Sequence, residues 1–346
     1  MRSRFRHLSR RFRWIFVLGY LKLTGEALAD DDRLGPLDRP SPQELRIAKD
    51  DEAFSAREAL HGATSSRQQC MTVPGGLWTE AGGQAECIRH YSAGVENGQA
   101  SALLVYLSGD AVSRTSGGVR FVVDSYAARS PNAIQAETEK WAAEAAMAAV
   151  YLARPGLHGS SGSHLMRRLK REVDLVDRAL DLLKDRYGTT RFIIAGHSGG
   201  GHLAAALLNR RHDVDAVVIS SGLVSVRQVV EHWDRRRKVP EGVIYDADGY
   251  IDPVDGLGSI RKDPMPRIFV ISDPEDRIVP FYTQLYYVRR LRAAGFRPQH
   301  IYASASDKRH HLLVQHARTA AALVAGGASN REVRRALAEI GPGDFD

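Results

Sequence analysis

The chain of 346 residues contains only two cysteines, Cys70 and Cys87, and neither has a histidine at the spacing of a metal ligand. A zinc site is therefore not expected, and no residue pattern calls for any other metal or organic cofactor. No segment beyond the N-terminus approaches the run of about 20 apolar residues that a membrane-spanning helix needs. Internal repeats and long low-complexity tracts are also lacking, which excludes repeat architectures.

Little net charge remains once the N-terminus is set aside. The whole chain carries a formal charge of +7, but residues 1–29 hold seven basic residues against Glu26 alone, so the rest is nearly neutral. A basic protein first suggests nucleic acid or an anionic membrane as its partner. Because the excess is confined to the N-terminus, we expect no nucleic-acid binding, and a membrane contact only if that segment is retained.

Residues 1–29 have the layout of an export signal. A basic stretch precedes the apolar run WIFVLGYL at 14–21, and Ala27-Leu28-Ala29 has the small-x-small pattern of a cleavage site. Ser9-Arg10-Arg11-Phe12 loosely resembles a twin-arginine signal, although Lys22 and Glu26 interrupt the apolar run. We expect a periplasmic or secreted protein. An uncleaved anchor at 14–21, an organellar presequence and a cytoplasmic location are the alternatives.

The two cysteines also bear on whether the protein is exported. In an oxidising compartment Cys70 and Cys87 can form one disulfide that closes a short loop near the start of the folded domain. Two unrelated buried thiols fit the sequence equally well.

From residue 84 onward, short apolar runs alternate with amphipathic stretches. This alternation predicts the α/β class, with a mainly parallel central sheet and helices on both faces. We expect residues 30–66 to be a linker with a short helix at 41–60, and 67–346 to be one domain with a cap or a long connection at 222–263. Strands are expected at 103–107, 149–153, 191–195, 214–219, 268–272 and 299–303, and helices at 134–146, 165–187, 201–209, 281–294 and 312–325.

The segment RFIIAGHSGGG at 191–201 carries the strongest functional signal. Gly196-His197-Ser198-Gly199-Gly200 satisfies G-x-S-x-G, follows an apolar run and opens a helix of small residues. This is the setting of a nucleophile elbow, in which a strained turn exposes the serine. A glycine-rich loop that merely joins strand to helix is the alternative. We predict that Ser198 is a catalytic nucleophile.

A serine hydroxyl needs a base to activate it and an acid to orient that base. In this arrangement the acid and then the histidine follow the serine along the chain. Asp276 lies in the loop after the strand expected at 268–272, and we predict that it is the acid. Its neighbours Asp273 and Glu275 are alternatives.

The base is expected after the strand at 299–303, where His310 and His311 precede the last helix. We favour His311, which is nearer the helix, and keep His310 as the alternative. His316 lies further into the helix, where a core or surface role is expected.

Backbone N–H groups are expected to stabilise the oxyanion. The N–H of Gly199 directly follows the nucleophile. A second donor should come from the loop after the strand at 103–107, which places Gly109 and Asp110 as candidates.

With these residues located, the chain from about 84 to 325 resembles the α/β-hydrolase superfamily. The stretch DRIVP at 276–280 looks like the D-x-x-V-P stretch of its dienelactone-hydrolase and prolyl-oligopeptidase branches. ARPGLHGSSG at 153–162 resembles a loop near the active site of bacterial hydrolases of that type, although a simple Pro/Gly turn fits too. No His-Gly-Gly-Gly motif is present, and the N-terminal region is too short for a propeller.

The resemblance implies hydrolysis of an ester, thioester or amide through an acyl-serine intermediate, with a small-molecule ester or a peptide-like molecule as substrate. A peptidase of the prolyl-oligopeptidase type and a non-catalytic binding protein with the same fold are the alternatives. The specific substrate depends on side chains that converge from distant loops, and a single sequence does not reveal them.

Overall fold

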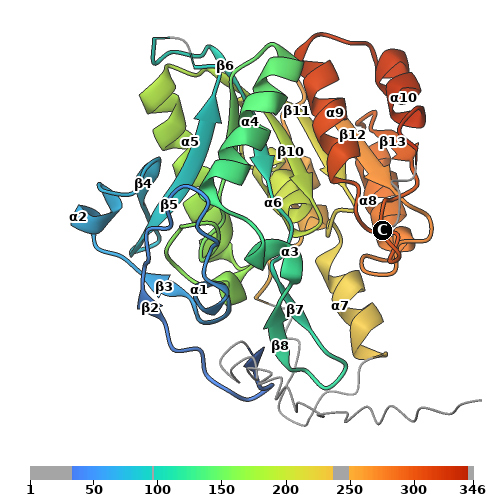
Figure 1. Cartoon of the computed structure of the whole chain (residues 1–346). Helices are drawn as coiled ribbons and strands as arrows, with labels where there is room; N and C mark the ends of the chain where they lie inside the picture. Colours follow the sequence, from blue (N-terminus) through green and yellow to red (C-terminus); the bar gives the residue numbers. More distant parts are fainter. Residues whose placement is uncertain (1–32, 96, 237–248, 342–346) are drawn as a thin grey trace, which may run out of the picture. The chain divides into compact units, whose positions relative to one another are not determined.

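The computed structural model describes residues 33–95, 97–236 and 249–341 (Figure 1). The chain divides into two compact units, Met1–Asp30 and Asp31–Asp346. The described residues all belong to the second unit, so the predicted export signal and part of the connection at 222–263 lie outside them.

An eight-stranded sheet forms the centre of the second unit. Its strands lie in the order β13-β12-β11-β10-β6-β9-β5-β4, and every neighbouring pair is parallel except β9–β5 and β5–β4, which are antiparallel. The predicted α/β class with a mainly parallel sheet is confirmed. In chain order the strands are β4 (Gly76–Ala81), β5 (Gln84–Ala93), β6 (Ala102–Leu107), β9 (Ala149–Leu152), β10 (Arg191–His197), β11 (Val214–Ser220), β12 (Arg267–Ser272) and β13 (Gln299–Tyr302).

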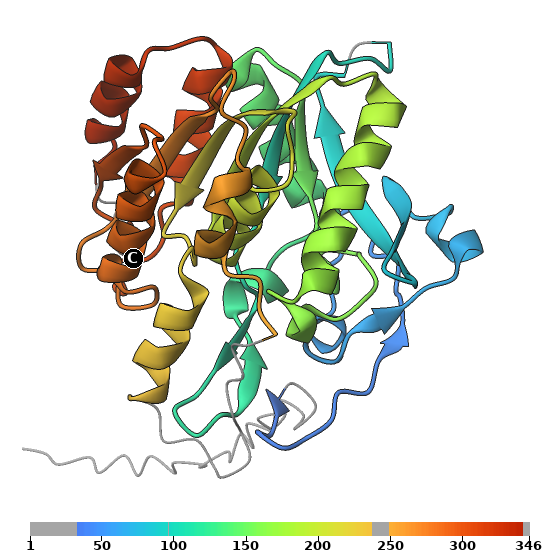
Figure 2. The ribbon, with the colours of Figure 1, turned by 180° about the vertical axis from the view of Figure 1, so that it is seen from behind.

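Helices cover both faces of this sheet. On the face seen in Figure 1, α4 (Pro131–Ala145) and α9 (Val314–Ala325) pack together, and α10 (Asn330–Ala338) packs on α9. On the opposite face, shown in Figure 2, lie α5 (Lys170–Tyr187), α6 (Gly199–Leu208) and α8 (Phe281–Ala293). The central strands are apolar runs because both of their faces are buried under helices.

Smaller elements that the sequence did not predict flank the sheet. After β6 the chain forms a hairpin of β7 (Val112–Arg114) and β8 (Arg120–Val122), and β1 (Arg33–Leu34) pairs with β8. The short helix α3 (Asp124–Ala127) then leads to α4. Two further strands, β2 (Gln43–Glu44) and β3 (Ala63–Thr64), pair with each other.

Two expected helices begin later than the pattern predicted. The expected helix at 41–60 is wrong over most of its length, because α1 (Ala56–His61) begins only after Ser55, whose side chain caps the N–H of Glu58. The helix expected from Leu165 is preceded by a single 3-10 turn and starts at Lys170. Arg168 has a φ of 70°, a left-handed conformation that a helix cannot include.

The connection at 222–263 begins with α7 (Val226–Asp234) and ends with the 3-10 helix η3 (Pro253–Ser259). Val226 and Val229 of α7 pack with Leu223 and with Val279 from the loop after β12. This contact brings α7 next to the loop in which the acid is expected.

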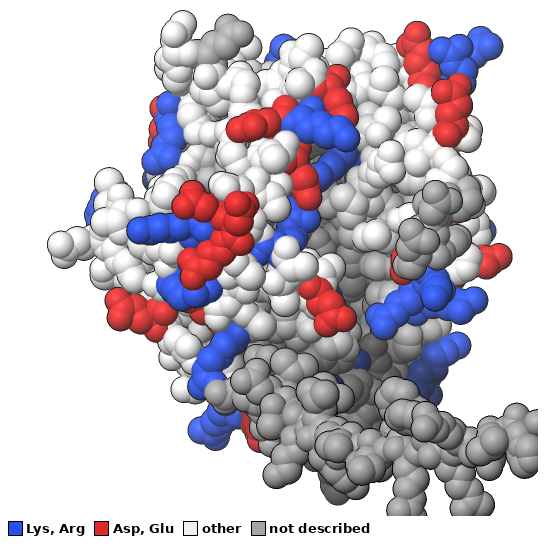
Figure 3. All heavy atoms as spheres, viewed as in Figure 1, with Lys and Arg blue, Asp and Glu red and all other residues white. Residues whose placement is uncertain are grey.

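Cys70 and Cys87 form a disulfide with a Cα–Cα distance of 5.4 Å, which links α2 (Arg67–Cys70) to β5. This is one of the two arrangements that the sequence left open. Basic and acidic side chains are interspersed over the face shown in Figure 3, as the near-neutral charge of this part of the chain leads one to expect. Among the described residues, no helix has both the length and the apolarity to cross a membrane.

Candidate active site

Ser198 lies in the turn between β10 and α6, with φ 53° and ψ −116°. A positive φ is uncommon for a residue with a side chain, and here the surrounding structure holds it. The Ser198 N–H donates to the carbonyl of Ser220 at the end of β11, and its own carbonyl accepts from Leu223. The serine therefore sits on a strained, well-anchored turn at the carboxyl edge of the sheet.

Glycines allow this turn to be tight. A β carbon at Gly196 would overlap the carbonyl of Gly200, and one at Gly200 would overlap the carbonyl of Leu107 in β6. In both cases the obstacle is backbone, which cannot move aside as a flexible side chain can. The motif's glycines are thus required by the close approach of α6 to β10 and β6.

Three backbone N–H groups beside Ser198 are available as donors. The N–H groups of Gly109, Asp110 and Gly199 have no acceptor in the described parts of the chain. Gly109 lies against the nucleophile, since a β carbon built on it would stand 3.3 Å from the β carbon of Ser198. Gly199 is the first residue of α6, so its N–H lies at the positive end of the helix dipole.

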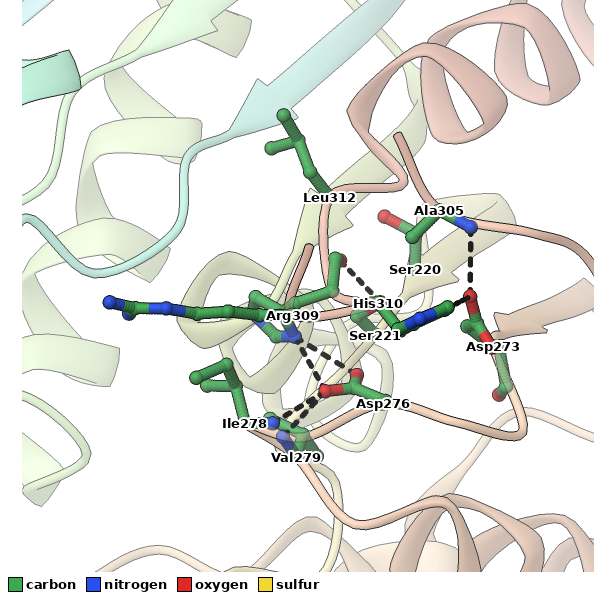
Figure 4. Close-up of polar contacts among 12 residues, drawn as sticks. Ser220, Ser221, Asp273, Asp276, Ile278, Val279, Ala305, Arg309, His310 and Leu312 are labelled. Atoms are coloured by element: carbon green, nitrogen blue, oxygen red, sulfur yellow. Dashed lines mark hydrogen bonds and ion pairs between the residues drawn. The ribbon is translucent and has the colours of Figure 1, made fainter. Parts of the chain in front are cut away.

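Asp276 follows β12 in a loop that leads into α8. Its Oδ1 accepts hydrogen bonds from the N–H groups of Ile278 and Val279, at 2.8 and 2.9 Å (Figure 4). The carboxylate side chain is fully buried. These two bonds fix its direction and satisfy part of its charge away from water.

His311 meets this carboxylate. Its Nδ1 lies 2.9 Å from Oδ2 and 3.1 Å from Oδ1 of Asp276. The ring also lies 5.0 Å, centroid to centroid, from that of His197, the residue before the nucleophile. Ser198 and His311 line the same cavity. The structure therefore brings together Ser198, His311 and Asp276 from three separate loops.

His310 points elsewhere. Its Nδ1 lies 3.3 Å from Asp273 (Figure 4). Its Nε2 lies 3.5 Å from Glu275. It does not contribute to the wall of the cavity that contains Ser198. The two neighbouring histidines thus pair with different carboxylates, and Asp273 and Glu275 lie with His310.

Asp307 organises the loop that carries both histidines, and it was not among the residues predicted from the sequence. Its Oδ1 accepts from the N–H groups of His311 and Leu312 at 2.7 and 2.6 Å, and its Oδ2 accepts from Arg309 at 3.2 Å. Burial alone would raise the pKa of this carboxyl. The three backbone hydrogen bonds together outweigh burial, so the pKa lies below its ordinary value. An aspartate that opens a tight turn is the signal that could have identified it.

Ser221 holds the same loop from the other side. Its hydroxyl donates to the carbonyl of His311 at 2.8 Å, and its φ of 44° places it in the left-handed region. His311 is therefore held through its N–H, its carbonyl and its ring.

The side chain of Asp110 has a role that the sequence did not predict. Its carboxylate is bound by Arg154 at 2.9 Å, by Arg167 at 3.1 Å and by Arg168. Burial raises the pKa of this carboxyl, but the three guanidinium groups hold it well below its usual range. Asp110 therefore remains ionised, and its bonds fix the loop that follows β6.

Arg154 extends this network into the core. The side chain is fully buried and bonds Glu172 of α5 through Nη2 at 2.7 Å and the carbonyl of Ser108 at 3.2 Å. It stands in the ARPGLHGSSG segment, whose resemblance to hydrolase loops predicted a place near the active site. The buried arginine ties that segment, the loop after β6 and α5 together.

A cavity of about 760 Å³ opens on Ser198. Its described wall includes apolar side chains, among them Leu223, Val229, Trp233 and Ile278. It also includes charged groups and four tyrosines, which are Tyr106, Tyr126, Tyr151 and Tyr250. This volume is in the range of pockets that hold small organic ligands.

No cluster of three or more His, Cys, Asp or Glu side chains within the described residues has the arrangement of a metal site.

Residues 164–325 match the prolyl oligopeptidase family, a segment that contains Ser198, Asp276 and His311. The match confirms the resemblance to that branch of serine hydrolases. No curated protein is significantly similar in sequence.

Several solved structures are similar in fold. The acylaminoacyl peptidase of Pyrococcus horikoshii is 12% identical, with a TM-score of 0.45 over 66% of this chain and 36% of the peptidase. An esterase of Pyrococcus furiosus is 15% identical, with a TM-score of 0.46 over 66% of this chain and 80% of the esterase. A puromycin-hydrolyzing peptidase of Mycobacterium tuberculosis is 13% identical, with a TM-score of 0.45 over 77% and 39% of the two chains. The chain spans well under half the length of these two peptidases.

Proposed function

We propose that this chain, a serine hydrolase of the α/β-hydrolase fold, cleaves ester bonds through an acyl-serine intermediate. Ser198 is the nucleophile, His311 the general base and Asp276 the acid that orients it. The observation that carries the proposal is the 2.9 Å contact between His311 Nδ1 and Asp276 Oδ2 beside a strained Ser198 in the same cavity.

In the acylation step His311 Nε2 takes the proton of the Ser198 hydroxyl while Oγ attacks the carbonyl carbon. The resulting imidazolium keeps its Nδ1–H directed at Asp276, whose negative charge stabilises it. His311 then gives the proton to the departing alkoxide, and the bond between the carbonyl carbon and the alcohol oxygen breaks. The acyl group remains on Ser198.

The negative oxygen formed during attack needs donors that are in place beforehand. The N–H of Gly199 and those of Gly109 and Asp110 support this role, since none of them has an acceptor among the described residues. The network of Arg154 and Asp110 holds the second loop in position for it.

Deacylation repeats the same steps with water. His311 accepts a proton from the attacking water, and the new oxygen bonds the acyl carbon. The proton then returns to Ser198 Oγ as the acid product leaves. Apart from water and the substrate, this scheme uses only the chain's own residues.

Peptide or amide cleavage is a second candidate, which the match of residues 164–325 to the prolyl oligopeptidase family favours. Turnover of short acyl 4-nitrophenyl esters should be compared with turnover of aminoacyl 4-nitroanilides. Ester turnover that exceeds anilide turnover supports the esterase proposal. Turnover of anilides alone would replace it with the peptidase, and activity on neither would favour a binding role.

We also propose that the protein is exported, with residues 1–29 as the signal. The Cys70–Cys87 disulfide supports this, because such bonds persist in oxidising compartments. N-terminal sequencing of the mature protein tests the proposal. A sequence that starts near residue 30 supports it, and a sequence that starts at Met1 contradicts it.

A further inference from the structure

The wall of the active-site cavity is rich in arginine. Among the described residues, six guanidinium groups line it, whereas the carboxylates in the same wall are only three, Asp110, Glu137 and Asp307. No lysine belongs to this described part of the wall. The six arginines are Arg114, Arg129, Arg167, Arg168, Arg309 and Arg318.

Each of the three carboxylates is already engaged. Asp110 holds Arg154, Arg167 and Arg168. Glu137 of α4 bonds Arg129 at 2.7 Å and Arg318 of α9 at 2.9 Å, so a single carboxylate pairs with two guanidinium groups. Burial alone would raise the pKa of Glu137, but the two arginines together outweigh burial and bring the pKa below its ordinary value. The carboxylate therefore remains ionised at neutral pH.

Asp307 accepts hydrogen bonds only from backbone N–H groups, so its carboxylate does not pair with the guanidinium charge of Arg309. The guanidinium of Arg309 has no hydrogen-bond or ion-pair partner among the described residues. Figure 4 shows this side chain fully extended, with its guanidinium directed away from Asp276 and from the contacts of His310. Arg309 lines the same cavity as Ser198 and His311, so a group that it binds lies in that cavity.

Two of the three histidines in the described wall do not alter this balance at neutral pH. Burial lowers the pKa of His158 and of His197 well below the usual value, so both are neutral. The third is His311, the proposed base. Burial also lowers the pKa of Arg167 to about 10, which still leaves it charged at pH 7. Among its Arg, Lys, Asp and Glu side chains, the described part of the wall therefore carries three more positive than negative groups.

We infer that the substrate of this hydrolase carries a carboxylate away from the scissile bond, and that Arg309 binds it. Arg309 is an exposed residue that also lines the cavity, so a carboxylate that enters from solvent can reach it. A guanidinium matches a carboxylate through two parallel N–H donors. The excess of arginine would reject a cationic substrate for the same reason. This inference rests on the proposed function and names the class of substrate for that site.

Matched esters test the inference. On the acyl side, the 4-nitrophenyl ester of glutaric acid is compared with that of its isosteric monoamide. On the alcohol side, 4-acetoxybenzoate is compared with 4-acetoxybenzamide. We expect kcat/KM to be at least about tenfold higher for the anionic member of one pair, mainly through KM, and to decline with added salt. Equal or lower values for the anionic member of both pairs would overturn the inference.

Substitutions of Arg309 test whether this residue causes the preference for the anionic ester. Arg309→Gln should reduce the preference for the anionic ester to less than about threefold, and Arg309→Lys should retain most of it. Arg289→Gln serves as the control, because Arg289 is exposed on α8 and does not line the cavity. Arg289→Gln should leave both the preference and the turnover of the neutral ester unchanged, and for the Arg309 variants the ratio of anionic to neutral kcat/KM is compared. A preference that survives in Arg309→Gln would remove Arg309 from the assignment.

The Ser198→Ala variant separates this inference from the proposed function. It cannot form the acyl-enzyme, so calorimetry with the same esters measures binding alone. Tighter binding of the anionic ester supports the carboxylate site even if turnover is never found. Labelling of Ser198 by a neutral fluorophosphonate, together with equal binding of both esters, would leave the hydrolase intact and refute the carboxylate site.

Discussion

Asp110 occupies the space in which a side chain at residue 199 would stand. A β carbon at Gly199 would overlap the carboxylate Oδ1 of Asp110 and lie 2.8 Å from Nη1 of Arg154. The residue after the nucleophile is thus in direct contact with the charge network that holds the loop after β6. Both loops that are proposed to donate to the oxyanion are coupled through this one contact.

Gly199→Ala should therefore impair catalysis through the position of Asp110. We expect kcat to fall by about 10²-fold or more with a smaller change in KM, the loss typical of one oxyanion donor. Gly258→Ala is the control, since no atom lies within 4 Å of the position of its β carbon. Steady-state kinetics on one ester measures both. A kcat for Gly199→Ala within about threefold of the parent would refute the proposed coupling.

The two neighbouring histidines should differ sharply in their effect on activity. His311→Ala removes the group that lies 2.9 Å from Asp276, and we expect kcat to fall by about 10³-fold to 10⁴-fold. His310→Ala removes a group paired with Asp273, and its kcat should stay within about tenfold of the parent. Equal losses in the two variants would contradict the assignment of the base.

Substitutions at Asp276 and Asp273 form a second matched pair of variants. Asp276→Asn keeps the shape of the side chain but loses the charge that orients His311, and we expect a fall in kcat of about 10⁴-fold. Asp273 accepts from the N–H groups of Glu275 and Ala305, so Asp273→Asn should mainly lower stability. Kinetics combined with urea unfolding distinguishes the two effects. A larger loss of kcat in Asp273→Asn would contradict the account.

The sequence predicted the centre of the fold and the loops that carry Ser198, Asp276 and His311. It could do so because the central strands are short apolar runs, and because the glycines of the turn have a local signature. The hairpin β7–β8 and its partner β1 were missed, since each strand has three residues or fewer and no visible alternation. The cluster of Asp110, Arg154, Arg168 and Glu172 was also missed, since no local pattern relates charges from separate loops and helices.

Several buried histidines should make the fold sensitive to acid. Burial lowers the pKa of His90 and of His202 to about 4. Because the unfolded chain binds these protons first, the free energy of unfolding is greatest above about pH 6.5 and falls as the pH drops toward 4. Each such histidine contributes a slope of at most about 1.4 kcal/mol per pH unit in that window.

Urea unfolding at pH 7, 6, 5 and 4 measures this slope. His202→Gln should make it shallower, because the buried ring of His202 no longer has to be kept neutral. His212→Gln is the control, since His212 is exposed in the loop after α6. An identical slope for the two variants would contradict the role assigned to His202.

The central claim is that Ser198 is an activated nucleophile. Residues 30–346 should be incubated with a fluorophosphonate probe beside the variant Ser198→Ala, with both proteins shown to be folded by circular dichroism. The account predicts labelling of the parent, no labelling of Ser198→Ala, and much slower labelling of His311→Ala than of His310→Ala. An unlabelled but folded parent, or a label that remains in Ser198→Ala, would contradict it.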